Sequence, residues 1–217
     1  MKEVYVSDFL ATAILTAKGQ YGNGNLRSEK LKSLGYDPDK IQRVVNVILP
    51  YINDTKANIS TIKNNITLAY AWAIETCKDP KVKYSQARRN KGVHQGFTFY
   101  DCSSFIWYAL SAGNFPVKEA YKRIMGFEYQ GNAITTAYEG LWLSVLGFKR
   151  HSPSETWKAG DILLRKGHTE MVYEGKTGGK GITMGAHGSS LPAEKQVSIN
   201  TGMSASANWV DLYRYGD

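Results

Sequence analysis

One short segment constrains this chain more than any other: a cysteine at the start of an apolar helix. Residues 100–104 read Tyr-Asp-Cys-Ser-Ser, and the apolar side chains of residues 105–110 follow with helical spacing. Asp101 and the serines are cap residues, so the helix is predicted to begin within about two residues of Cys102. There, unpaired N–H groups and the helix dipole favour a thiolate. Cys102 is therefore a candidate nucleophile, and a small buried apolar residue is the alternative.

Length, charge and cysteine count narrow the class of protein. The 217 residues suit one medium domain, or a small module followed by a domain of about 150 residues. The two cysteines, Cys77 and Cys102, do not make a disulfide framework. The net charge of +8 suits nucleic acid, an anionic membrane surface or a polyanionic cell wall. The basic residues are scattered, however, which disfavours a nucleic-acid binder.

No stretch of the sequence predicts membrane insertion or secretion. A membrane span needs roughly 18–20 apolar residues, and no run approaches that length. The apolar run of residues 9–17 is short, and Glu3 and Asp8 stand where a signal peptide carries positive charge. An amphipathic helix is the better interpretation of this segment.

The first fifty residues have the pattern of three short helices. Apolar side chains recur with helical spacing over residues 5–18, 26–34 and 37–48, with turn residues between them. We therefore predict a small three-helix bundle over residues 1–52. The polar segment 53–65 is predicted to be a linker.

This first module resembles the Cpl-seven type cell-wall-binding repeat. The matching positions are an aromatic-Gly-Asn-Gly loop, an arginine, a Gly-Tyr turn and a Gln…Val-Asn ending, found at residues 21–24, 27, 35–36, 42 and 45–46. The resemblance implies binding to the muropeptide and glycan parts of peptidoglycan. Tyr21, Arg27, Tyr36, Gln42 and Asn46 offer stacking surface, a cation and two amides to such a ligand. Tyr21 stands where tryptophan is more usual, and a single copy leads the chain.

The rest of the chain, residues 66–217, predicts helices followed by an antiparallel sheet. Apolar spacing indicates helices at residues 66–78 and about 133–146, the first with Cys77 in its core stripe. Strand patterns with glycine-rich turns occur at residues 159–165, 167–173, 182–187 and 209–215. The predicted fold class is α+β: a papain-like domain with a thiol-bearing helix and a histidine-bearing sheet, preceded by the three-helix module.

This second region resembles the NlpC-type cysteine peptidase superfamily, and most closely its phage-lysin branch. The shared blocks are Tyr-Ser-Gln, Tyr-Asp-Cys-Ser-Ser, Gly-Asp-Ile-Leu, His-Thr and an aromatic closing strand, at residues 84–86, 100–104, 160–163, 168–169 and 209–215. The resemblance implies hydrolysis of an amide bond in the peptide stem of bacterial peptidoglycan. It assigns Cys102 as the nucleophile and His168 as the general base, aided by a third polar residue.

The third catalytic position departs from the family pattern. Family members carry a polar residue just before an alanine on the strand after the base, but here Gly185 stands in that position. His187, two residues further and on the same strand face, is the candidate replacement, and a surface or substrate-facing role is the alternative. Glu170 shares a strand face with His168, and we expect it either to contact substrate or to tune the base.

Two further assignments complete the predicted site. Tyr84 is assigned to the catalytic group because its segment would supply an oxyanion donor beside the backbone N–H of Cys102, and packing over the helix is the alternative. A zinc ion held by Cys102, His168 and His187 is a rival chemistry. The close ligand spacings of zinc motifs are missing, so we expect neither a metal nor a cofactor.

Taken together, the two resemblances predict a modular cell-wall lysin. Both N-acetylmuramoyl-L-alanine amidase and stem endopeptidase activities occur on this scaffold. A phage endolysin made in the host cytoplasm, without a signal peptide, would act on the wall after release. The alternative, motivated by Gly185, is a wall-binding or virion structural protein whose hydrolase domain has lost turnover.

Overall fold

The computed structural model describes residues 12, 13, 16, 17, 19–39, 41, 42, 45, 46, 66–130, 135–200 and 208–216. The described part is a mixed α+β structure built on a six-stranded antiparallel sheet, which confirms the predicted fold class at that level. The sheet order is β3-β8-β4-β5-β6-β7. The strands are β3 (Phe148–His151), β4 (Ile162–Arg165), β5 (His168–Lys176), β6 (Lys180–Ala186), β7 (Val197–Asn200) and β8 (Asp211–Tyr215).

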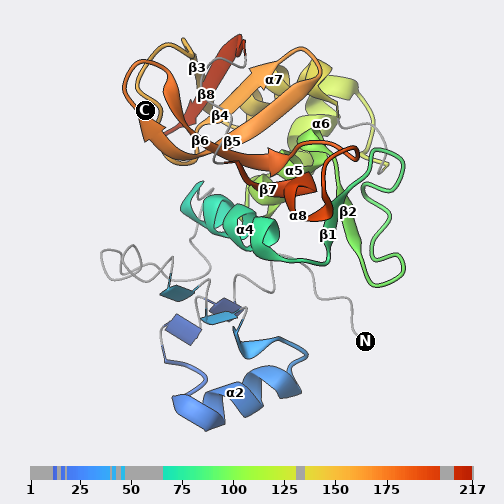
Figure 1. Ribbon diagram of the computed structural model, residues 1–217, viewed down its shortest axis with the longest axis vertical. Coiled ribbons are helices and arrows are strands. Elements are labelled where there is room, and N and C mark those ends of the chain that lie inside the picture. Colours follow the sequence, from blue (N-terminus) through green and yellow to red (C-terminus); the bar gives the residue numbers. More distant parts are fainter. Residues whose placement is uncertain are drawn as a thin grey trace.

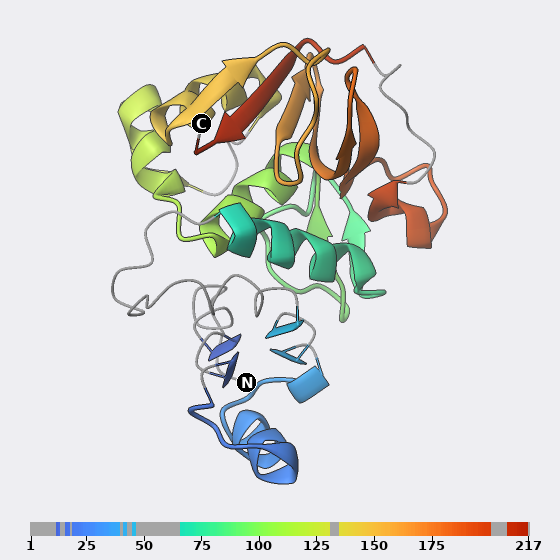
Figure 2. The same cartoon turned by 90° about the vertical axis from the view of Figure 1, so that its left-hand side faces the viewer.

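Helices cover one face of this sheet. The helices α4 (Ile66–Lys78) and α5 (Cys102–Ala112) pack against each other beneath the sheet, α5 against β5 and β6 and α4 mainly against β6 and β7 (Figures 1 and 2). The remaining elements of this region are β1 (Val82–Tyr84), β2 (Thr98–Tyr100), α6 (Val117–Met125), α7 (Thr136–Val145) and α8 (Ala193–Gln196). The short strands β1 and β2 pair in parallel, apart from the main sheet.

Helix α5 lies at the centre of the core. Phe105, Ile106 and Leu110 have no exposed surface, in agreement with the helical spacing predicted for them. Trp107 packs edge-on against Trp142 of α7, with 5.7 Å between ring centroids. The first turn of α5 is therefore part of a tightly packed helix, which holds the side chains at its N-terminal end in place.

The sheet buries apolar side chains on both faces. Along β4, Ile162 and Leu164 belong to the main core with the helices, whereas Leu163 belongs to a second core. The other members of this second core are Trp157, Val172, Trp209 and Leu212. Because side chains alternate across a strand, an apolar run such as β4 is stable only when both faces are covered.

The hairpin between β5 and β6 is tighter than predicted. The strand ranges 167–173 and 182–187 predicted from sequence leave residues 174–181 as their connection, but the two strands pair as far as Lys176 and Lys180. The glycines serve a different purpose, because a Cβ at Gly175 would lie 1.8 Å from the carbonyl oxygen of Trp157. Glycine is required there so that the segment around Trp157 can cross the strand closely.

The described part of the first module contains one complete helix, α2 (Gly24–Ser33). It ends in a Schellman motif: Gly35, at φ 88°, donates to Lys32, and Tyr36 donates to the carbonyl of Leu31. The described residues 12, 13, 16, 17, 38, 39, 41, 42, 45 and 46 are also helical. The complete three-helix bundle remains a prediction, and the proposed linker 53–65 lies outside the described residues.

Among the described helices, none has the length and apolar character needed to cross a bilayer.

Candidate active site

Cys102 is the first residue of α5, as predicted, and Asp101 is its N-cap. The backbone N–H of Ser104 donates to the Asp101 carboxylate at 2.9 Å, and the backbone N–H of Asp101 donates to the Ser104 hydroxyl at 2.9 Å. This reciprocal capping box fixes where the helix begins. The guanidinium of Arg89 forms an ion pair with the same carboxylate, so the Asp101 charge is balanced. Asp101 therefore holds the helix start, which confirms its predicted role.

The Cys102 thiol lies against the backbone on both sides of His168. Its S–H donates to the carbonyl oxygen of Gly167 across 3.9 Å, and the backbone N–H of Thr169 donates to the sulfur. The structure thus brings the predicted nucleophile to the start of β5, where the predicted base is located. Residues that are 66 positions apart in sequence meet at the junction of α5 and β5.

The structure corrects the expectation that the helix start favours a thiolate at Cys102. Burial is the largest of the causes that raise the pKa of Cys102 to about 12, and negative charge on Glu139 or Asp101 acts in the same direction. The backbone N–H groups of Thr169 and Ser103 act in the opposite direction but do not compensate. Because only 7% of Cys102 is exposed, a thiolate there loses most of its hydration. The raised pKa keeps the sulfur as a thiol near neutral pH, so any nucleophilic role of Cys102 would require a base.

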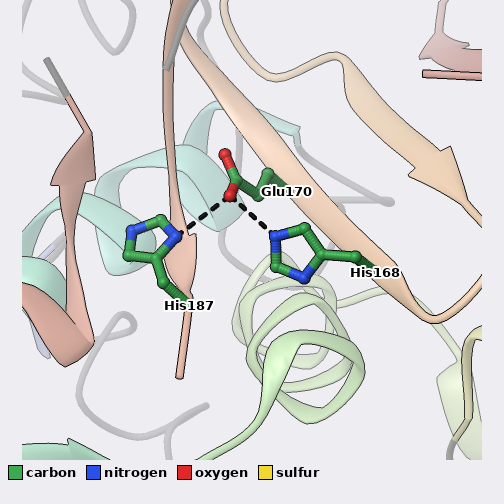
Figure 3. A group of neighbouring side chains, drawn as sticks. All are labelled: His168, Glu170 and His187. Atoms are coloured by element: carbon green, nitrogen blue, oxygen red, sulfur yellow. Dashed lines mark hydrogen bonds and ion pairs between the residues drawn. The ribbon is translucent and has the colours of Figure 1, made fainter. Parts of the chain in front are cut away.

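Three side chains on neighbouring strands form the most strongly polar cluster of the site (Figure 3). Glu170 lies between two imidazole rings: its Oε1 is 2.8 Å from Nε2 of His168 and 3.0 Å from Nδ1 of His187. His168 and Glu170 are two residues apart on β5 and share a face, as predicted. His187 directly follows the end of β6. The indole of Trp209 stacks on the His168 ring, with 5.8 Å between centroids.

The protonation of His168 follows from its partner. Burial alone would raise the pKa of Glu170, but the hydrogen bonds from His168 and His187 outweigh it and lower that pKa to about 2. Glu170 is therefore a carboxylate, which only accepts hydrogen bonds. The Nε2 of His168 must then carry a hydrogen, and in the neutral ring Nδ1 is left as the basic nitrogen.

His187 donates from both ring nitrogens. Its Nδ1 faces the Glu170 carboxylate, and its Nε2 lies 3.1 Å from the carbonyl oxygen of Ser198. Both partners only accept hydrogen bonds, so both nitrogens carry hydrogen and the ring is a cation. Burial would lower the pKa of His187, but Glu170 and the Ser198 carbonyl outweigh it and raise that pKa. The cation of His187 balances the buried charge of Glu170.

Gly185 now has a structural explanation. Met171 pairs with Met184 across the β5–β6 ladder, so Glu170 and Gly185 face each other. A Cβ at Gly185 would approach Cγ of Glu170 to 3.3 Å, a tight contact. The space in front of position 185 is thus filled by the Glu170 side chain from the neighbouring strand. Glu170 has no exposed surface, which favours a role in tuning His168 over contact with substrate.

The Tyr84 phenol lies near the side chains of Cys102 and Asp101. Burial, followed by the charges of Cys102 and Asp101, raises the pKa of its phenol, so the hydroxyl is within electrostatic range of the sulfur. The backbone N–H of Tyr84 donates to the side-chain oxygen of Gln196 at 3.2 Å. The phenol, rather than this N–H, is therefore the group through which Tyr84 can serve as a donor.

Sequence reasoning missed Glu139, which belongs to the same neighbourhood. It lies on α7 with no exposed surface, and the Thr169 hydroxyl is 2.7 Å from its Oε1. The sequence spacing could have indicated that Glu139 is buried, because Glu139 shares a helix face with Trp142 and Leu143, three and four positions further on. An acid on the apolar stripe of a helix indicates a buried polar site.

The first module gathers three of its five predicted ligand residues into one chain of hydrogen bonds. Nη1 of Arg27 donates to Oε1 of Gln42 at 2.9 Å, and Nε2 of Gln42 donates to Oδ1 of Asn46 at 2.8 Å. Tyr21 and Tyr36 are half-buried and pack against apolar residues. The amide of Gln42 thus links the guanidinium of Arg27 to the amide of Asn46.

His168, Glu170 and His187 are also a possible metal-ligand set. Their ligand atoms all lie within 4.8 Å of one another. This set differs from the zinc site considered from sequence, because Glu170 takes the place of Cys102. A bound zinc would hold each ligand atom at about 2.0–2.2 Å, and it would replace the two hydrogen bonds that Glu170 now accepts.

The described fold and site define an α+β protein with a thiol at a helix start and a carboxylate-bridged pair of histidines on the adjoining sheet. Residues 8–49 match the family model of the CW_7 repeat, which supports the predicted cell-wall-binding repeat and indicates cell-wall binding. The match covers the first module only. Comparisons of the chain with curated proteins and with solved structures gave no match.

Proposed function

We propose that this protein is a peptidoglycan hydrolase of the phage-endolysin type. In this proposal the first module holds the protein on the bacterial wall, and Cys102 and His168 cleave an amide bond of the peptide stem. The main support is the position of the Cys102 sulfur, which contacts the backbone of Gly167 and Thr169 on either side of the base. The CW_7 match supplies independent support for the wall as target.

The reaction begins with proton transfer. Nδ1 of His168 accepts the thiol proton as the sulfur attacks the carbonyl carbon of the scissile amide, because a buried thiol of high pKa is a poor nucleophile until a base removes its proton. The imidazolium that forms is stabilised by Glu170, 2.8 Å from Nε2. Trp209 stacks on the ring and keeps it in one orientation.

The tetrahedral intermediate then collapses. The backbone N–H of Cys102 and the Tyr84 hydroxyl donate to the oxyanion. His168 returns its proton to the leaving amine, the C–N bond breaks, and a thioester to Cys102 remains. Water, deprotonated by His168, hydrolyses the thioester and releases the carboxylate product and the free thiol.

The nucleophile is tested by Cys102→Ala, with Cys77→Ala as the matched control. Cys77 is a partly buried thiol on α4 that packs against the core. We expect wild type and Cys77→Ala to clear purified cell walls, and Cys102→Ala to bind the walls without clearing them. Equal inactivity of wild type and Cys102→Ala would instead favour a wall-binding or virion structural protein without turnover.

A metal-dependent hydrolase is the second candidate, because His168, Glu170 and His187 have the donor atoms of a metal site. Iodoacetamide and a chelator distinguish the two chemistries. The thiol mechanism predicts loss of clearing after iodoacetamide and full clearing after dialysis against EDTA. The opposite pattern would support a metal-dependent mechanism.

Mass spectrometry of the released muropeptides identifies which amide bond is cleaved, since an amidase and a stem endopeptidase leave different new amines.

A further inference from the structure

The mechanism above leaves one buried acid unused. Glu139 has no exposed surface, and it projects from α7 toward the start of α5 and β5. Its Oε2 is buried and has no hydrogen-bond partner in the described part of the chain. No lysine, arginine or histidine of that part forms an ion pair with it. A carboxylate in such a place would be costly, because nothing compensates for its lost hydration.

The hydrogen bonds of Thr169 show where a proton is needed. The Thr169 hydroxyl lies 2.7 Å from Oε1 of Glu139 and 2.9 Å from the carbonyl oxygen of Leu163. A hydroxyl has one hydrogen, so it donates to only one of two acceptors. If Glu139 were ionised, both neighbours of the Thr169 hydroxyl would be acceptors. The oxygen that receives no hydrogen would then face the hydroxyl oxygen, lone pair against lone pair. If Oε1 carries a proton, Glu139 donates to Thr169 and Thr169 donates to Leu163, and both contacts are hydrogen bonds.

The charges around Glu139 support the same assignment. The groups that face it are Asp101 and Cys102 at the start of α5, Thr169 on β5 and Tyr213 on β8. Burial raises the pKa of Glu139 well above its ordinary value, and the charge of Asp101 adds to this, although the Thr169 hydrogen bond acts in the opposite direction. An ionised Glu139 would also disfavour the thiolate that forms during the reaction.

We propose that Glu139 is a neutral carboxylic acid that positions the nucleophile. Its proton holds the Thr169 side chain, and the backbone N–H of the same residue donates to the Cys102 sulfur. Glu139 is thus a positioning residue that acts through Thr169, and its neutrality keeps an additional negative charge away from the sulfur. The positioning role rests on the proposed function, whereas the protonation state does not.

The protonation state is tested by the pH dependence of stability in the full chain. Between the unfolded pKa and the raised folded pKa, the folded state holds one proton more than the unfolded state, so stability falls as pH rises. We expect the folding equilibrium constant of wild type, relative to Glu139→Gln, to fall by up to about tenfold per pH unit above pH ~5. Glu119→Gln, at an exposed position, is the control and should parallel wild type. Parallel curves for wild type and Glu139→Gln would overturn the proposal.

The positioning role is tested by two substitutions of similar size. The amide of Glu139→Gln can still donate to Thr169, whereas Glu139→Met fills the space without a donor. We expect Glu139→Met to clear walls at least about tenfold more slowly, and Glu139→Gln to recover most of that loss. Equal clearing by both folded variants would overturn the positioning role. An inactive but folded Glu139→Gln would do the same, because it would mean that the carboxylate is required. If wild type itself clears no walls, the proposed function fails, and the stability test still decides the protonation state.

Discussion

At the scale of single residues, Glu170 sets the protonation of both histidines. As a carboxylate that only accepts hydrogen bonds, it requires a hydrogen on Nε2 of His168 and on Nδ1 of His187. Nδ1 is thereby left as the basic nitrogen of the neutral His168 ring. The carboxylate has no exposed surface, and its Oε1 accepts from both histidines. One buried charge therefore determines which nitrogen of His168 can accept a proton.

Replacing Glu170 by glutamine tests this role. The amide oxygen can still accept from His168, but it no longer stabilises the imidazolium by charge. We expect wall clearing to slow by about 10²-fold at neutral pH, with wall binding unchanged in co-sedimentation. Glu174→Gln, at an exposed position of the same strand, should clear walls like wild type. Unchanged clearing by folded Glu170→Gln would contradict the role.

The cation of His187 predicts a pH-dependent stability. Its folded pKa is raised, so the stabilisation that it contributes is complete below the unfolded pKa of about 6.5 and is lost as pH rises through the folded pKa. Urea unfolding of wild type and His187→Gln should therefore differ most near pH 6 and converge at alkaline pH. A difference that stays constant across this range would indicate that His187 is neutral in the folded protein.

At the scale of elements, the site is built where α5, β5 and the end of β6 meet. The capping box fixes the first residue of α5, and the β5–β6 register brings Glu170 opposite Gly185. The second core packs against the other face of the sheet, and the segment around its member Trp157 crosses the hairpin at Gly175. Close packing of that segment over Gly175 is therefore part of what keeps β5 in place.

The substitution Gly175→Ala tests the close crossing. Its Cβ would lie 1.8 Å from the Trp157 carbonyl oxygen, so the backbone must move. We expect a loss of about 1–3 kcal/mol in the free energy of unfolding, measured by chemical denaturation. Gly188→Ala is the control, because the nearest atom to its Cβ is 4.0 Å away. Equal stability of the two variants would show that the backbone around Trp157 can move away from position 175 without a loss of stability.

The sequence pattern predicted the helices that carry a long run of regularly spaced apolar residues. It missed short strands and contacts that depend on residues far away in the sequence. The helices α4, α5 and α7 agree with their predicted ranges to within a few residues, because each carries a continuous apolar stripe. The four-residue strands β3 and β7 were missed, because so short a segment carries little alternation. The contact between Glu170 and Gly185 depends on strand register, and the buried state of Glu139 depends on what packs against α7. Neither is a property of a local pattern.

At the scale of the whole molecule, the chain combines a cell-wall-binding repeat with an α+β region that carries a buried thiol and two histidines. The CW_7 match and the hydrogen-bonded chain of Arg27, Gln42 and Asn46 concern the first module. The thiol and the two histidines lie more than fifty residues later in the sequence. If binding and cleavage are separate, each can be removed without the other.

Arg27→Ala tests that separation. Loss of the guanidinium removes a charged donor and the partner of Gln42, so we expect about tenfold weaker co-sedimentation with purified walls. Cleavage of soluble muropeptides should be unchanged. Lys30→Ala, on the exposed side of α2, is the control. A parallel loss of soluble cleavage would mean that the two functions are not independent.

The facing pair of Glu170 and Gly185 has a consequence for how this chain can vary. Any side chain added at position 185 would press on Cγ of Glu170, 3.3 Å from the new Cβ. A larger residue at position 185 is thus accommodated best when position 170 carries a shorter one. A double substitution that adds a side chain at 185 and shortens the one at 170 should therefore be tolerated better than the substitution at 185 alone.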